Sequence, residues 1–576
     1  MVKVFAPLAA LVITLGLAAP AAADDVFSWG GNFSGELGDG TTTHQSAPVP
    51  VDTTGVLAGK RITDLGSGPD AGHACVIAEG RVYCWGENTS GKLGDGTTTN
   101  RTRPIAVDAV LAGKTVTAVA AGGDHTCVLA DGTPYCWGEN SDGQLGDGTT
   151  IDRGAPTPVN TSGVLAGKQI TTITAGAVHT CVLADGRPYC WGGNPSGQVG
   201  DGTTIDRSNP GPVWSASGGI AGKAVTALDA GVLHTCVVAD GQAFCWGRNA
   251  DGALGDGTNT NRTIPVPVNT SGALAARTVT AISASAHTCA VADAKPFCWG
   301  LNTFGQLGDG TQTQRTEPTL VNISGVLAGR SVQAITAGEL HTCAVADQKV
   351  SCWGRNEFGS VGKGSLSTTE KLPVDVVGLA PRQPRLLEAS DSSVYFLAAQ
   401  APTAPRDPWA QVATRAVTVS WAAPLDDGGR AVTTYLVTTE GGSCQTTGTS
   451  CTLTGLTPGG QYTVSVVARN AIGDSPATTV AAVVPKARQS FAVPKRIKKR
   501  GVTVLVKKRA KTSAGARVKT TVKTKGKVKV IRKKGGVKVR TFGKKPRRVV
   551  LTQTAPGTAT HEPFSQKVVY KKGKRS

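Results

Sequence analysis

Methionine and aromatic residues are scarce in this sequence, and long apolar runs are almost absent. The 576 residues include one methionine and 74 glycines, and aromatic residues make up 5% of the chain. No segment carries apolar residues at helical spacing over a useful length, which argues against a helical bundle and favours turn-rich β-structure. The chain is also longer than one hydrophobic core usually serves, so we expect several domains.

The one long apolar run lies at the N-terminus, where it follows Lys3 and extends from Val4 to about Leu17. Small residues then lead to an Ala-x-Ala site before Asp24. This order predicts a secretory signal peptide over residues 1–23, cleaved between Ala23 and Asp24. An uncleaved anchor is the alternative, but the run is short for the roughly 20 residues that spanning needs, and no other segment approaches that length. We therefore expect a secreted or envelope-associated chain without a transmembrane segment.

A Trp-Gly motif recurs along most of the chain at intervals of 52 to 56 residues. Each copy precedes a version of Asn-x-x-Gly-x-Leu-Gly-Asp-Gly, as at residues 140–148, and a fixed period of this length indicates a repeat architecture. The third period contains four β-like runs, at 115–120, 125–130, 133–137 and 155–160. Four short strands per repeat predict a β-propeller blade. The tryptophans are Trp29, Trp85, Trp137, Trp191, Trp246, Trp299 and Trp353.

Twelve of the 14 cysteines form six pairs with a separation of nine residues. A tight-turn pair such as Asp131-Gly132 lies midway between the two cysteines of each pair and predicts a type I′ hairpin. Counting out from that turn places the cysteines at a non-hydrogen-bonded position, where a disulfide can form. The predicted disulfides join Cys75 with Cys84, Cys127 with Cys136, Cys181 with Cys190, Cys236 with Cys245, Cys289 with Cys298, and Cys343 with Cys352. Disulfides in turn indicate an oxidising compartment.

The two ends of the array are complementary. The first Trp-Gly motif lacks a preceding cysteine strand, and the last repeat lacks a following one. We expect the strand at 26–30 to insert beside 393–399 and close a seven-bladed propeller over residues 24–400. Ser28 and Tyr395 would stand at the cysteine positions of this blade, which alone would have no disulfide.

These motifs resemble the regulator of chromosome condensation repeat family, in the secreted bacterial form with Cys-Trp-Gly and His-Thr-Cys signatures. The resemblance covers roughly Asp24 to Gln400. Nuclear members exchange nucleotide on a small GTPase and bind chromatin, but a predicted export signal would separate this chain from such partners. The fold class is therefore expected to be all-β.

Two segments follow the array. Residues 401–485 resemble a fibronectin type III domain, with Trp421 as the core tryptophan and Tyr462 as the tyrosine corner. Such a domain would act as a spacer, and Cys444 with Cys451 would form a local disulfide, although their register fits a two-residue turn less well.

Residues 486–576 contain 31 Lys and Arg and one acidic residue, Glu562, a net charge of +30, whereas the remainder has 29 basic and 39 acidic residues, a net charge of −10. Valine and lysine alternate at 502–506, 518–523, 527–530 and 537–540, which predicts strands. A disordered polycation is the alternative. We expect this segment to bind anionic cell-envelope polymers. Nucleic acid is a less suitable ligand, because the few aromatic residues are not interleaved with the basic ones.

Two recurring residue types could suggest metal sites. The histidines lie two residues before a cysteine, but a fourth zinc ligand is missing, so we expect each imidazole to bond a neighbouring strand or loop. The loop aspartates offer too few oxygen ligands for calcium, and turn formation accounts for them. The histidines are His73, His125, His179, His234, His287 and His341; the aspartates are Asp39, Asp95, Asp147, Asp201, Asp256 and Asp309, with Lys363 in the seventh loop.

No catalytic constellation, cofactor site or metal site is identified, which favours a monomeric binding scaffold whose propeller loops engage a protein or a glycan. A second hypothesis is an enzyme inhibitor, because some secreted bacterial propellers resembling this family block β-lactamases. Exposed aromatic residues on one face would favour it, yet these loops are rich in Thr, Asn, Asp and Gly. A third is a carbohydrate-active hydrolase with accessory modules, which would need two acidic groups about 5–9 Å apart in a deep channel.

Overall fold

A computed structural model describes residues 26–107, 110–213, 219–489, 501–507, 519–525, 528–533, 536–541, 548–556, 561–571 and 574–575. The predicted signal peptide and its cleavage site at Ala23 and Asp24 lie outside these residues. All regular elements in the described ranges are β-strands or turns, and none is a helix that could span a membrane. The chain divides into two compact units, residues 1–399 and 400–576.

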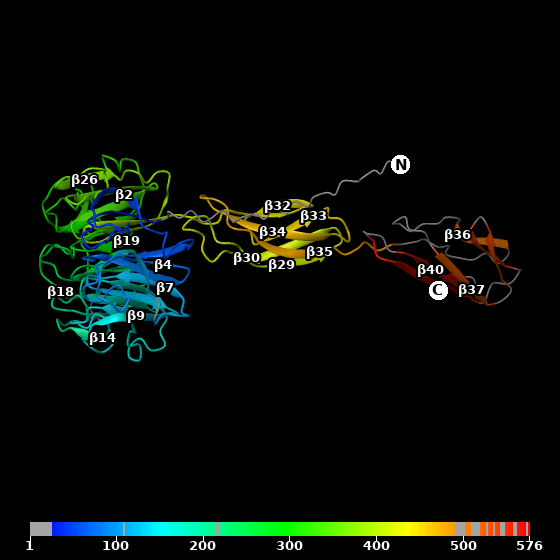
Figure 1. Cartoon of the computed structure of the whole chain (residues 1–576), viewed down its shortest axis with the longest axis horizontal. Coiled ribbons are helices and arrows are strands. Elements are labelled where there is room, and N and C mark those ends of the chain that lie inside the picture. The colour runs from blue at the N-terminus through cyan, green and yellow to red at the C-terminus, as the bar shows by residue number, and fades with distance from the viewer. Residues whose placement is uncertain are drawn as a thin grey trace, which may run out of the picture. The chain divides into compact units, whose positions relative to one another are not determined.

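The first unit is a propeller of seven four-stranded antiparallel sheets (Figure 1). Blade 1 contains β3 (Ile62–Gly66), β4 (His73–Ala78), β5 (Arg81–Gly86) and β6 (Arg101–Ala106); blade 2 contains β7 (Val116–Ala121), β8 (His125–Ala130), β9 (Thr133–Gly138) and β10 (Arg153–Pro158); blade 3 contains β11 (Ile170–Ala175), β12 (His179–Ala184), β13 (Arg187–Gly192) and β14 (Arg207–Pro212). Blade 4 contains β15 (Val225–Ala230), β16 (His234–Ala239), β17 (Gln242–Gly247) and β18 (Arg262–Pro267); blade 5 contains β19 (Val279–Ala284), β20 (His287–Ala292), β21 (Lys295–Gly300) and β22 (Arg315–Leu320); blade 6 contains β23 (Val332–Ala337), β24 (His341–Ala346), β25 (Lys349–Arg355) and β26 (Thr369–Asp375).

Blade 7 is assembled from both ends of the array. Its strands β27 (Pro384–Ala389) and β28 (Ser393–Ala398) pair with β1 (Val26–Gly30) and β2 (Gln45–Pro50), in the order β2-β1-β28-β27. Ser28 lies opposite Tyr395, the register expected from the cysteine spacing of the other blades. Two N-terminal strands, rather than one, therefore complete the ring.

Each blade of the first six contains one disulfide across its central hairpin. The Cα atoms of the two cysteines are 4.1 to 4.2 Å apart. Both central residues of each hairpin turn have positive φ, as a type I′ turn requires; Asp131 and Gly132 have φ of 50° and 74°.

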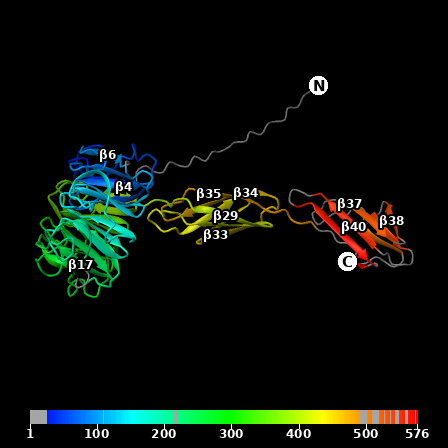
Figure 2. The same ribbon diagram turned by 90° about the horizontal axis from the view of Figure 1, so that it is seen from below.

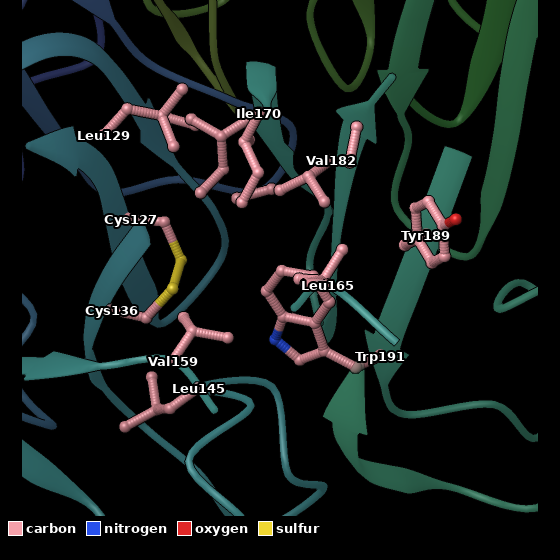
Figure 3. Close-up of a cluster of buried hydrophobic side chains, with 14 residues drawn as sticks. Cys127, Leu129, Cys136, Leu145, Val159, Leu165, Ile170, Val182, Tyr189 and Trp191 are labelled. Carbon is pink, nitrogen blue, oxygen red and sulfur yellow. A yellow bond between two sulfur atoms is a disulfide. The ribbon is translucent and has the colours of Figure 1, made fainter. Parts of the chain in front are cut away.

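The propeller core lies between neighbouring blades. Figure 3 shows one such cluster, in which Trp191 of blade 3 lies with Leu145, Val159 and the Cys127–Cys136 disulfide of blade 2. The seven repeat tryptophans are fully buried in equivalent clusters. Because each blade buries one face against the next, closure by blade 7 also buries the faces that the two ends of the array would otherwise expose.

The second unit begins with a β-sandwich that has the fibronectin type III features. One sheet contains β29 (Arg406–Ala413), β30 (Ala416–Ala422) and β33 (Ser450–Thr454), and the other contains β31 (Thr434–Thr439), β32 (Gly442–Thr446), β34 (Gln461–Arg469) and β35 (Thr478–Val483) (Figure 2). Trp421 lies in the core, and the Tyr462 hydroxyl accepts a hydrogen bond from the Thr457 N–H group at 2.8 Å. The Cys444–Cys451 disulfide joins strands of the two sheets, which explains why its register does not fit a hairpin.

The basic segment contains strands in each of the four predicted regions. They are β36 (Gly501–Lys507), β37 (Lys519–Lys525), β38 (Val528–Lys533) and β39 (Gly536–Thr541), accompanied by β40 (Arg548–Ala555), β41 (Phe564–Lys571) and β42 (Lys574–Arg575). They form sheets in the orders β36-β39-β38 and β37-β40-β41-β42.

Candidate protein-binding face

The propeller has two faces that differ in what they carry. In blade 2, segments 122–124 and 139–152 connect strands on one side, which we call the loop face. The hairpin turn at 131–132 and the segment 159–169 lie on the other side, which we call the turn face. In the antiparallel closing blade, β1 starts and β28 ends on the turn face. The chain therefore enters and leaves the propeller there, and the loop face carries neither connection.

Five of the six recurring histidines bond a threonine of the next blade near the loop face. His125 Nε2 lies 2.8 Å from Thr180 Oγ1 of the next blade, and the Thr180 hydroxyl donates to the Gln144 carbonyl oxygen at 2.8 Å. Since that hydroxyl hydrogen is already used, the imidazole must donate from Nε2, so the neutral ring is the Nε2–H tautomer. Burial accordingly lowers the pKa of His125 to about 4. Trp191 Nε1 donates to the same carbonyl, so one oxygen of blade 2 receives two donors from blade 3.

The loop aspartates stabilise their own turns. Asp147 Oδ1 accepts the Thr149 N–H group at 2.8 Å, while Oδ2 accepts two hydrogen bonds from Arg153. Burial opposes ionisation, yet the bonds from Thr149 and Arg153 hold the pKa of Asp147 below its usual value. In the seventh loop the charges are exchanged, because Lys363 pairs with Glu370. These contacts give each side chain a structural role.

Four carboxylates lie on connections between the first and second strands of neighbouring blades, on the loop face. The segments that join the first and second strands of the blades carry Asp391, Asp70 and Asp124 in blades 7, 1 and 2, and Glu339 in blade 6; we call these four residues the acidic arc. Blades 3, 4 and 5 have Val178, Leu233 and Ala286 in the same segments. Burial and a hydrogen bond with Asp391 raise the pKa of Glu339 to about 8.

An aromatic cluster lies beside the arc, on the loops of blades 5, 6 and 7. It consists of Phe33, His44, Phe304, Phe358 and Arg355. The ring of Phe33 is 4.9 Å from that of Phe358 and 4.5 Å from that of His44. The Arg355 guanidinium lies 4.9 Å and 5.4 Å from the rings of Phe358 and Phe304. Phe33 is 58% exposed, which is uncommon for so large an apolar side chain and typical of a contact surface.

Three more carboxylates, Asp64, Asp229 and Glu388, lie on the first strands of blades 1, 4 and 7. Burial raises the pKa of Asp64 and of Asp229 to about 6, and that of Glu388 well above its usual value. Asp229 accepts hydrogen bonds from the Ala284 N–H group at 2.8 Å and the Thr174 hydroxyl at 3.2 Å, and so connects three blades. Its oxygens are engaged in holding strands together, a structural role rather than that of an available acid.

The turn face has its charges paired by repeat contacts. Lys168 lies 3.5 Å from Asp185 and 5.8 Å from the Tyr189 ring centroid, and other blades repeat this arrangement. A pocket of about 420 Å³ on this face is lined in part by Asp375 and Arg382. Arg330 pairs with Asp375 at 2.8 Å, and Arg382 lies over the Phe27 ring. The loop face is therefore the stronger candidate.

Comparison with known proteins agrees with the propeller geometry. Residues 13–290 match the RCC1-like domain, residues 295–345 the regulator of chromosome condensation (RCC1) repeat, and residues 403–484 the fibronectin type III domain. The chain is 32% identical over 347 residues to the ultraviolet-B receptor UVR8 of Arabidopsis thaliana, covering 59% of this chain and 75% of that protein. The chain belongs to the RCC1-like propeller family.

Other members of this family share the propeller in different settings. The human E3 ubiquitin-protein ligase HERC2 is 29% identical over 352 residues, which are 60% of this chain but 7% of the ligase. Human WBSCR16 aligns with a TM-score of 0.56 at 22% identity, covering 66% of this chain and 100% of that structure. Prp20p of Saccharomyces cerevisiae aligns with a TM-score of 0.55 at 20% identity, covering 65% and 91%. These two structures support the fold alone.

The sequence interpretation of this RCC1-like propeller missed the aromatic cluster. It described the loops as rich in Thr, Asn, Asp and Gly, whereas three phenylalanines gather on one side of the loop face. Aligning the loops residue by residue would have revealed them. Phe304 and Phe358 stand two residues after the loop asparagine, where the other loops have Ser or Asp, and Phe33 stands one residue after it. An aromatic residue that breaks a polar repeat position serves something other than the blade.

Proposed function

We propose that this chain is an extracellular binding scaffold whose propeller engages a protein partner through the loop face. The observation that carries this proposal is the aromatic cluster, which combines an exposed ring with an adjacent arginine on a surface free of chain connections. Aromatic residues and arginine are enriched where proteins bind one another, and carboxylates nearby would add specificity.

Its relatives are consistent with binding. Prp20p binds Gsp1p and histones, and a crystal structure contains Kap60 bound to yeast RCC1. Those partners belong to those proteins. Ligase activity is not transferred from HERC2, of which this chain spans only 7%. The disulfides favour an extracellular setting, and the predicted signal peptide would deliver the chain there.

A site-specific photocrosslinker tests the binding face. We place p-benzoylphenylalanine at Phe33 in the full chain, and at Asp240 in a turn-face hairpin as the matched control. With exported proteins of the source organism, discrete crosslinked products are expected from position 33 and not from position 240. Equal patterns from both positions would contradict a specific face. A glycan partner would instead give sugar adducts at position 33, and an exported enzyme as the adduct would support the inhibitor hypothesis.

The basic segment supports a second part of the function, attachment to anionic polymers of the cell envelope. Its +30 charge would neutralise many phosphates at once, so affinity should fall steeply with salt. Retention of the full chain on immobilised polyglycerol phosphate, compared with a chain ending at residue 485, measures this. Equal retention of the two chains at low salt would contradict an anchoring role of the basic segment.

A further inference from the structure

The boundary between blades 1 and 2 contains a buried lysine that shows how this fold binds an ammonium group. Lys92 Nζ lies 2.8 Å from Glu87 Oε2, 2.7 Å from Asp124 Oδ1 and 3.2 Å from the Gly123 carbonyl oxygen. The side chain is 1% exposed, so the two carboxylates are neutralised from within the propeller. One end of the acidic arc is thus satisfied by the chain itself.

The next boundaries have no such cation at the equivalent loop position. Ser360 stands there between blades 6 and 7, and its hydroxyl donates to the Ser392 carbonyl oxygen at 2.6 Å. Glu36 stands there between blades 7 and 1, which adds a buried carboxylate. Within the described ranges, no lysine or arginine lies within ion-pair distance of Asp391, Asp70 or Glu339. Three of the four carboxylates of the acidic arc therefore lack the ion pair that Lys92 forms with Asp124.

The aromatic cluster lies beside these three carboxylates. Arg355 begins the loop of blade 6, and its N–H group donates to the carbonyl oxygen of Leu340, which follows Glu339 in the chain. Its guanidinium is already paired with Glu357 at 2.7 Å and stacked on two rings. An exposed aromatic surface next to carboxylates suits a long cationic side chain, because the rings contact its methylene groups and attract its charge.

We infer that the partner inserts a lysine side chain between blades 6, 7 and 1, where its ammonium group contacts Asp391, Asp70 and Glu339 and its neighbouring residues pack on Phe33 and Phe358. This inference rests on the proposed function and names the chemistry of the partner. The raised pKa of Glu339 is consistent with it, because burial and the neighbouring carboxylates of Asp391 and Asp70 outweigh the attraction of Arg355, and a further cation at this place would meet an excess of acidic groups. Charge complementarity selects the partner's cationic residue, and the rings select its apolar neighbours.

Two synthetic peptides test the inference with the full chain. The first is acetyl-Gly-Val-Lys-Val-Gly-amide, and the second carries Nε-acetyl-lysine instead of lysine. Saturation-transfer NMR should detect the lysine peptide, with at least about tenfold weaker binding of the acetylated one. Asp391→Asn should weaken lysine-peptide binding by a similar factor, and Asp240→Asn on the turn face should leave it unchanged. Equal binding of the two peptides would overturn the inference.

The buried Lys92 suggests a stricter variant, Ser360→Lys, which places a lysine at the equivalent loop position between blades 6 and 7. A lysine at this position should reach the arc as Lys92 does, raise the thermal midpoint, and abolish binding of the lysine peptide. If Ser360→Lys fails to fold, Asp391→Asn and Phe33→Ser still decide the question. Full strength of peptide binding in all folded variants would refute the site. Crosslinking at Phe33 that persists in these variants would show that the face binds a partner by other chemistry.

Sedimentation velocity separates an external partner from a second copy of this chain. The basic segment carries many lysines, and its docking on another copy would appear as self-association of the full chain. A monomeric full chain is expected. Self-association that disappears in Asp391→Asn would assign the site to the basic segment of a second copy and overturn the external partner.

Discussion

In blades 1 to 6 a disulfide packs against the tryptophan of the following blade, whereas in blade 7 a tyrosine occupies that place. Tyr395 lies in the cluster with Trp85, with ring centroids 6.3 Å apart. Its hydroxyl donates to the Glu36 carbonyl oxygen at 2.9 Å, the role that a threonine hydroxyl has in blades 2 to 6. Ala74 stands at the threonine position of blade 1, so the tyrosine hydroxyl of blade 7 replaces the missing threonine.

This difference follows from how each blade is made. Blades 1 to 6 are continuous segments, so a disulfide closes a short loop within one blade. Blade 7 joins residues that are far apart in sequence, and it depends on hydrogen bonds and packing between the two ends of the array. The comparison teaches that closure of this ring is the noncovalent step, and the predictions below are ordered by how strongly they alter it.

Reduction of the disulfides should have the largest effect, because it removes the covalent bond that stabilises each of blades 1 to 6. Each hairpin disulfide should contribute about 2–3 kcal/mol, so six together contribute on the order of 10 kcal/mol. We expect the urea midpoint, followed by tryptophan fluorescence with thiol trapping, to fall sharply in the reduced chain. Cys127→Ala/Cys136→Ala should give a small fraction of that shift. An unchanged midpoint after full reduction would contradict the assignment.

Acidification should weaken blades 1 to 6 selectively, because blade 7 has Ser393 where they have histidine. Burial lowers the pKa of His179 and His287 to about 3, and that of His125, His234 and His341 to about 4. Below about pH 6.5 the histidines of the unfolded chain bind protons, whereas the buried histidines of the folded chain stay neutral. The free energy of unfolding therefore decreases as pH falls toward 4.

Carboxyls with raised pKa act in the opposite sense. The carboxyls with the largest upward shifts are Asp64 and Asp229, with a pKa of about 6, Glu339, with a pKa of about 8, and Glu388, whose pKa lies well above its usual value; these four are fewer than the six histidines. The net expectation is a urea midpoint that declines between pH 6.5 and 4.5. Midpoints at several pH values and constant ionic strength provide the measurement, and a midpoint that rises on acidification would show that the imidazoles are not the dominant groups.

Truncation of Tyr395 should weaken the boundary between blades 7 and 1, where no disulfide packs against the tryptophan. Tyr395→Ala removes a buried ring from beside Trp85, and we expect a loss of about 3–5 kcal/mol in the free energy of unfolding. Tyr395→Phe keeps the ring and removes only the bond to Glu36, for a loss of about 1 kcal/mol. Urea denaturation of both variants separates packing from hydrogen bonding. If the two variants lose the same free energy of unfolding, the aromatic ring of Tyr395 does not contribute to the closure of the propeller.

Much of this architecture could be predicted from sequence because the repeat constrains it seven times. The hairpin register followed from the turn pairs, and the position of Ser28 opposite Tyr395 followed from the cysteine spacing. The bond between His125 and Thr180 could not be located, because it joins residues of different blades that only ring geometry brings together. The contact of Phe33 with Phe358 was missed for the same reason, since it joins the first loop of the array to the last.

The smallest predicted effect concerns a bond that blade 7 fails to provide. His341 Nε2 is buried without a hydrogen-bond partner, because Val394 stands where blades 2 to 6 have threonine. The Ser360 carbonyl oxygen, the equivalent of the shared carbonyl, accepts a hydrogen bond from Trp29 Nε1 at 3.0 Å.

In Val394→Thr the new hydroxyl can donate to this carbonyl and accept from His341, as in the other blades. We expect a gain of about 1 kcal/mol in the free energy of unfolding. The matched change Thr180→Val in blade 3 should cause a loss, since it deprives His125 of its partner. Destabilisation by both substitutions would mean that blade 7 has packed around its valine, and that the histidine bond is dispensable where the ring closes.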